Sequence, residues 1–112
     1  MFLGVNLMKD HNEMGINLQV FDEIKNSILK NPKINKAVIF GSRARGDYKK
    51  TSDIDICIYG KDIQNMDINL LEDSLNEINT PLDFDIVYFD KISKEALKIN
   101  IEKDGILIYV KK

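Results

Sequence analysis

The fold and the candidate site of this chain are decided by residues 40–60, FGSRARGDYKKTSDIDICIYG. Gly41 and Ser42 follow an apolar run over residues 37–40, which is typical of a buried strand that ends in a turn. After the next ten residues, Asp53 and Asp55 open a second apolar run. Because side chains two residues apart share one face of a strand, both carboxylates are expected to point the same way. This layout is typical of a triphosphate-binding turn beside a divalent-metal site.

The flanking sequence shows the periodicities of further helices and strands. A first helix is predicted from Asn17, as N-cap, to the boundary at Asn31 and Pro32. A second helix is predicted over about 67–79 and a third from Ser93, as cap, to about 103. A short helical turn is expected over 43–45, and strands over 36–40, 53–59, 83–88 and 106–110. This order predicts an α+β fold, a mixed β-sheet with helices packed on one face.

Length and composition indicate a single domain that does not bind nucleic acid stably. The 112 residues suffice for one compact core. Residues 1–15 lack periodicity and are expected to form a flexible N-terminal arm, with a single domain over 16–112 and the translation start at Met1 or Met14. The 16 basic and 18 acidic residues give a net charge of −2, which argues against stable nucleic-acid binding.

No apolar run approaches the roughly 20 residues that span a bilayer, so no membrane association is expected. The first eight residues lack a basic leader and a cleavage site, and the single cysteine, Cys57, cannot form an intramolecular disulfide. We therefore expect a cytoplasmic protein in which Cys57 is a core side chain. His11 is the only histidine, which excludes a histidine-based zinc site or catalytic triad.

A third acidic position strengthens the metal hypothesis. Asp83 and Asp85 lie on one face of the strand predicted over 83–88. Three carboxylates from adjacent strands suit two Mg²⁺ ions about 3.5–4 Å apart, an arrangement used for nucleotidyl transfer. The alternative for the pair at Asp53 and Asp55 is a solvent-facing strand surface. Gly41 lets backbone approach phosphates closely, and Ser42 can donate to their oxygens.

The motif Gly41-Ser42, ten residues, Asp53-x-Asp55, with Asp85 on a later strand, resembles the nucleotidyltransferase superfamily that includes DNA polymerase β. It is more closely similar to the minimal nucleotidyltransferases (MNT), which are encoded beside HEPN or nucleotidyltransferase-substrate-binding proteins. The resemblance implies that Asp53, Asp55 and Asp85 are catalytic metal ligands. Asp85 is preferred because the family places the third acid directly before a hydrophobic pair, with Asp83 as the alternative. Nucleotide phosphates would be held by Gly41 and Ser42, helped by Arg43 or Arg45.

The resemblance also implies the activity and the partner. It implies a Mg²⁺-dependent nucleotidyltransferase that moves NMP, most simply AMP from ATP, to a hydroxyl of a partner protein. No segment follows Lys112 to grip an acceptor, so a HEPN-type partner in a hetero-oligomer, or a second copy, is expected to supply that site. The chain would be the antitoxin of a toxin–antitoxin pair. The alternatives are a non-catalytic, nucleotide-binding antitoxin that acts by complex formation and a nucleotidyltransferase that acts on an antibiotic.

Overall fold

The centre of the computed structural model, which describes residues 10–112, is a four-stranded mixed sheet. Its strands lie in the order β3-β2-β1-β4. β1 pairs antiparallel with both β2 and β4, whereas β2 and β3 are parallel. The α+β class and the mixed sheet predicted from the sequence are confirmed. The strand bounds are Ile34–Phe40 (β1), Ile54–Gly60 (β2), Phe84–Tyr88 (β3) and Ile106–Val110 (β4).

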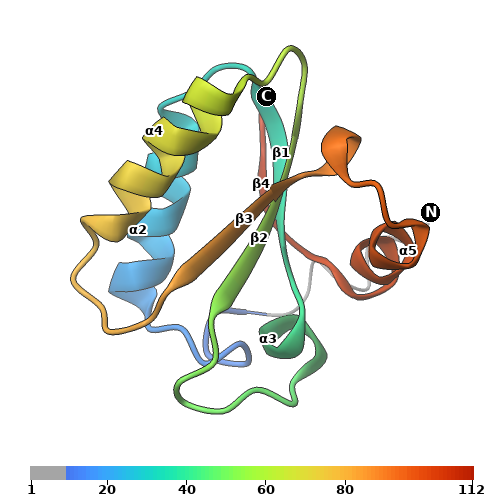
Figure 1. Ribbon diagram of the computed structural model, residues 1–112. Helices are drawn as coiled ribbons and strands as arrows, with labels where there is room; N and C mark the ends of the chain where they lie inside the picture. The colour runs from blue at the N-terminus through green and yellow to red at the C-terminus, as the bar shows by residue number, and fades with distance from the viewer. Residues whose placement is uncertain (1–9) are drawn as a thin grey trace.

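Helices cover both faces of this sheet. In Figure 1 the sheet is seen from its β3 edge, with α2 (Leu18–Leu29) and α4 (Asn65–Asn76) on one side and α5 (Glu95–Asp104) on the other. The prediction that all helices pack on one face is therefore wrong. Val38, Cys57 and their neighbours make the second face apolar too, and α5 covers it with Ile101.

Local capping explains where the helices begin. The Asn17 side chain accepts from the backbone N–H of Val20 at 2.9 Å, which confirms the predicted N-cap of α2. α4 begins at Asn65, earlier than predicted, because Gln64 and Asp67 form a capping box in which the Gln64 N–H donates to Asp67 at 2.7 Å. The predicted cap at Ser93 is wrong, since Lys94 precedes α5. Among residues 10–112, no helix has the length and apolar character needed to cross a membrane.

The larger part of the core lies between the sheet and the α2–α4 pair. Alternate residues of β2 point into it, so that Ile54, Ile56 and Ile58 are buried against the apolar faces of both helices. Cys57 points to the α5 face, where it is buried and free, as predicted. Burial raises the pKa of its thiol to about 12, which leaves it unreactive at neutral pH.

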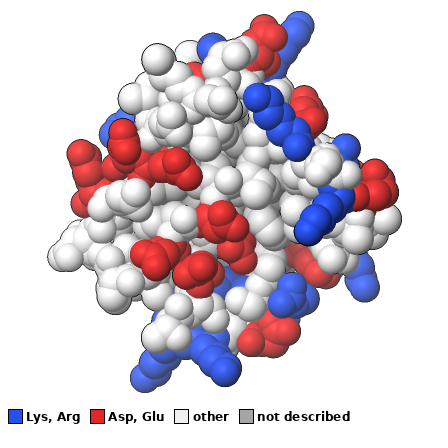
Figure 2. Space-filling view, in the orientation of Figure 1, with Lys and Arg blue, Asp and Glu red and all other residues white. Residues whose placement is uncertain are grey.

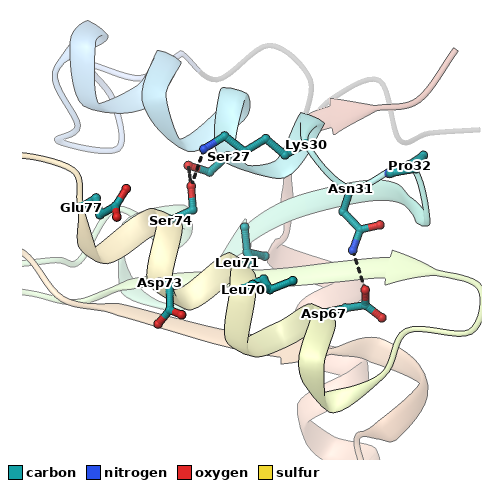
Figure 3. Close-up of a pocket in the computed structure, with 10 residues that line it drawn as sticks. All are labelled: Ser27, Lys30, Asn31, Pro32, Asp67, Leu70, Leu71, Asp73, Ser74 and Glu77. Atoms are coloured by element: carbon teal, nitrogen blue, oxygen red, sulfur yellow. Dashed lines mark hydrogen bonds between the residues drawn. The ribbon is translucent and has the colours of Figure 1, made fainter.

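Polar side chains join α2 to α4 where the two helices meet at the surface (Figure 3). The Ser74 hydroxyl donates to Ser27 Oγ at 2.8 Å and accepts from Lys30 Nζ at 3.1 Å. Nearer the start of α4, the Asn31 side-chain amide donates to Asp67 at 2.9 Å. These bonds satisfy the partly buried hydroxyls beside the apolar contacts.

The predicted N-terminal arm is described only in part, because residues 1–9 lie outside the described residues. Residues 10–15 form hydrogen-bonded turns, in which the N–H groups of Met14 and Gly15 donate to the carbonyls of His11 and Asn12. Met14 has an exposed fraction of 0% and belongs to the main core. Met14 thus packs against the domain, while the arm over 1–15 and the domain bounds of 16–112 stay predictions. Whether translation starts at Met1 or Met14 stays open.

Two leucines of α4 test the role of its buried face. Leu75 is 0% exposed, whereas Leu70 is 61% exposed on the same helix. We expect Leu75→Ala to lower the free energy of unfolding by about 2–5 kcal/mol, because it removes buried methyl groups and leaves a cavity. Leu70→Ala should change it by less than about 0.5 kcal/mol. Urea unfolding followed by circular dichroism checks both values, and equal losses in the two variants would contradict this packing.

Candidate functional site

The register of three strands brings the predicted acidic residues to one place. Asp55 on β2 pairs with Asp85 on β3 and, on its other side, with Phe40 at the end of β1. Neighbouring strands lie about 4.7–4.9 Å apart, so these positions are adjacent across the sheet. Asp53 directly precedes β2 and, two residues from Asp55, lies on the same face. That face is the one covered by α5, because Cys57 points to it as well.

The electrostatic environment of Asp55 reflects this crowding. Burial, and after it the nearby charges of Asp85 and Asp53, raise the pKa of the Asp55 carboxyl to about 6, while the charges of Arg45 and Arg43 oppose the shift. Asp83, the alternative third acid, lies just before β3, where its carbonyl accepts from the Ile54 N–H at 2.9 Å. The strand register therefore pairs Asp55 with Asp85 and not with Asp83.

The chemistry of these donors fits hard divalent cations. Figure 2 shows acidic side chains gathered in the middle of the face that is viewed, over the sheet edge that Figure 1 presents. Carboxylate oxygens are the ligands that Mg²⁺ prefers, and a bound cation would offset both the burial of Asp55 and the repulsion by Asp85 and Asp53 that raise its pKa. Within residues 10–112, no three acidic, histidine or cysteine side chains already converge on one point as metal ligands. The metal-ligand roles of Asp53, Asp55 and Asp85 thus stay predictions.

The glycine turn lies directly against Asp55. Gly41 has a φ of +74°, a conformation that side-chain-bearing residues rarely adopt. A Cβ atom at Gly41 would also collide with Oδ2 of Asp55. The Gly41 carbonyl accepts from the N–H groups of Ala44 and Arg45 at 3.1 and 3.0 Å, which starts the one-turn helix α3 (Ser42–Arg45). The Gly41-Ser42 turn therefore lies next to Asp55, the acid that pairs with Asp85. That Gly41 and Ser42 hold phosphates stays a prediction.

The two arginines of α3 have different environments. Arg43, predicted to help hold phosphates, is 1% exposed, and its guanidinium donates to backbone carbonyls inside the protein, so the structure does not support that role. Arg45 is exposed, and its Nε lies 3.3 Å from Asp47 Oδ2. Its charge favours ionisation of Asp55. Residues two apart in a helix face opposite sides. The sequence alone could therefore have predicted that Arg43 and Arg45 have different environments.

A groove of about 500 Å³ lies elsewhere, between α2 and α4 (Figure 3). Leu71 and Ser74 line it, together with acidic side chains of α4. Because α2 and α4 pack on the face opposite Asp55, this groove is separate from the candidate site.

The raised pKa of Asp55 predicts a pH-dependent stability in the absence of divalent cations. Its folded pKa of about 6 exceeds the ordinary value of 3.8, so ionisation of Asp55 opposes folding. The contribution of Asp55 to the free energy of unfolding therefore falls as the pH rises from about 4 to about 6 and is constant above. We expect Asp55→Asn to be more stable than the wild type at pH 8 by roughly 1–2 kcal/mol, after allowance for solvent screening.

Urea unfolding in EDTA at pH 8 and at pH 4 measures this difference. The extra free energy of unfolding of Asp55→Asn over the wild type should be smaller at pH 4 than at pH 8. Asp73→Asn on α4 should change the free energy of unfolding little at either pH. An Asp55→Asn variant that is less stable than the wild type at pH 8 would contradict the electrostatic account of the site.

Known proteins resemble this chain in sequence and in fold. The curated protein "Putative protein adenylyltransferase MJ1217" of Methanocaldococcus jannaschii is 35% identical over 101 residues, which cover 83% of this chain and 100% of that protein. A chain in the crystal structure of a toxin–antitoxin complex with AMP-PNP is 23% identical, with a TM-score of 0.69, and the match covers 82% of this chain and 74% of that chain. At this identity the match shows the fold alone.

A second solved structure gives a similar result. It contains a tri-AMPylated HEPN toxin of Shewanella oneidensis in complex with its MNT antitoxin, and a chain in it is 22% identical, with a TM-score of 0.57. That match covers 81% of this chain and 73% of that chain. The family model described as "Polymerase beta, Nucleotidyltransferase" matches residues 22–112, which include the glycine turn and the acidic residues Asp53, Asp55, Asp83 and Asp85. The chain therefore belongs to the polymerase beta nucleotidyltransferase family.

Proposed function

We propose that this chain transfers a nucleoside monophosphate, AMP from ATP, to a hydroxyl group of a partner protein. The observation that carries the proposal is the placement of Asp55 beside both Asp85 and the Gly41-Ser42 turn. Carboxylates next to a turn that can bind phosphate are the elements that nucleotidyl transfer needs. The 35% identical relative, which is named for protein adenylyltransferase activity, supports a protein as the acceptor.

In this proposal Asp53, Asp55 and Asp85 hold two Mg²⁺ ions. Bound there, the ions would lower the pKa of the acceptor hydroxyl and neutralise charge on the phosphates. Backbone at Gly41 and the Ser42 hydroxyl orient the β and γ phosphates, and Arg45 contributes positive charge from its exposed position on α3. The hydroxyl oxygen attacks the α-phosphorus, the bond to the β-phosphate oxygen breaks, pyrophosphate leaves and the hydroxyl proton is released.

We further propose that the acceptor is a HEPN-type protein with which this chain forms a hetero-oligomer as the antitoxin. The support is the shared fold with chains of toxin–antitoxin complexes, one of which contains an AMPylated HEPN toxin. The alternative is that this chain neutralises its partner by binding alone, and its support is that the similar chains were found in complex with their partners.

Carboxylate variants test the transfer reaction. Asp53→Asn and Asp55→Asn should lower the rate of pyrophosphate release by on the order of a thousandfold, since each removes a charge that holds the cations. The assay uses ATP, Mg²⁺ and a HEPN-type protein as the proposed acceptor, and circular dichroism checks that each variant is folded. Asp73→Asn is the matched control on the opposite face and should keep the wild-type rate.

Intact mass spectrometry of the partner identifies the product. The wild type should add the mass of one or more AMP groups to the partner, and EDTA should abolish this addition. A partner that is inhibited but unmodified would favour neutralisation by binding. Full activity in a folded Asp53→Asn, Asp55→Asn double variant would rule out the proposed site.

A further inference from the structure

Arg43 is a buried cation that connects separate segments of the chain. Its side chain is 1% exposed, and its guanidinium donates six hydrogen bonds to five backbone carbonyls. The Tyr48 ring lies over it, with the ring centre 4.9 Å from Cζ. Taking a charge out of water is costly, and these carbonyl dipoles are the groups that offset the cost. A buried cation with this many backbone partners is suited to holding separate segments of the chain in fixed positions.

Most of these carbonyls belong to the loop between α3 and β2. The Ser52 carbonyl accepts twice, from Nε at 3.1 Å and from Nη2 at 2.8 Å. The carbonyls of Lys49 and Lys50 accept from Nη2 at 3.5 and 3.3 Å. Asp53 is the next residue after Ser52, so Arg43 holds the peptide group that leads directly into the acidic pair.

The other end of this connection is the glycine turn. Arg43 directly follows Ser42 in α3, and that helix is anchored to the Gly41 carbonyl. On its remaining side, Nη1 donates to the carbonyls of Met14 and Gly15 at 3.0 and 3.1 Å. Met14 is itself buried in the main core, so the guanidinium connects the loop to a segment that is packed into that core.

We infer that Arg43 is a positioning residue that fixes the Gly41-Ser42 turn relative to Asp53 and Asp55 by holding the carbonyls of the intervening loop. This inference rests on the proposed function for its catalytic consequence. Arginine is required because its planar fork offers five donors in fixed directions, whereas a lysine offers three donors from one point. Displacement of a catalytic group by about 1 Å can lower a rate by on the order of a hundredfold.

Three variants test the inference against a matched control. Arg43→Lys keeps the charge and loses the fork, Arg43→Met loses both, and Tyr48→Leu removes only the ring over the guanidinium. Leu75→Ala is the control, because it destabilises the domain from the opposite face. All are assayed with ATP, Mg²⁺ and the partner protein, at a temperature well below the lowest Tm of the set.

Hydrogen exchange measured by mass spectrometry over residues 46–56 is the second readout, and it is independent of activity. We expect both Arg43 variants to speed exchange in this loop and to lower kcat by about ten- to a hundredfold, with the KM for ATP changed by less than about threefold. Tyr48→Leu should lower kcat less. Leu75→Ala should lower the Tm but keep kcat and the loop exchange near the wild-type values.

Arg43→Lys with wild-type kcat and loop exchange would overturn the inference, as would a loss of kcat no larger than that of Leu75→Ala. If neither Arg43 variant folds, Tyr48→Leu provides the test. Faster loop exchange together with a lower kcat would support the inference, and no change in either would overturn it. A wild-type protein without transfer activity would refute the proposed function. The exchange data would still show whether Arg43 holds the loop.

Discussion

Asp55 lies on the central part of the sheet, paired with Phe40 on one side and Asp85 on the other. A slip of one residue in either pairing would turn carboxylates to the opposite face and bring isoleucines in their place. Ile54 and Ile56, which flank Asp55 along β2, are fully buried against α2 and α4 and resist such a slip. Burial of apolar side chains on one face therefore determines where the acidic groups lie on the other.

This arrangement keeps like charges together at a cost in stability. Burial and the charges of Asp85 and Asp53 raise the pKa of Asp55, so its ionised form opposes folding. Gly41 makes room for the carboxylate, because a Cβ atom at this position would collide with it. A fold that served only its own stability would gain by neutralising these acids. Charged groups that are kept close together although they lower stability are typical of sites that bind cations or transfer protons. In the proposed function, cation binding is the use of these acids.

The sequence was most informative where local rules apply. Alternation predicted the shared face of Asp53 and Asp55, and turn and cap residues predicted most element boundaries to within a few residues. Two features depended on packing between distant segments and were not predicted. One is the position of α5 on the second face. The other is the burial of Arg43, whose carbonyl partners include Met14 and Ser52, at quite different places in the chain. The joint roles of these residues in binding cations and nucleotide remain predictions.

The central claim is that the acids of β2 and β3 and the glycine turn form one cation site. Substoichiometric Mn²⁺, which prefers the same oxygen ligands as Mg²⁺, broadens amide signals near its binding site in NMR spectra. We expect broadening at residues 41–43, 53–55 and 85, and unaffected signals along α4, which carries acidic residues on the opposite face. Broadening confined to α4, or spread evenly over the acidic surface, would contradict the account.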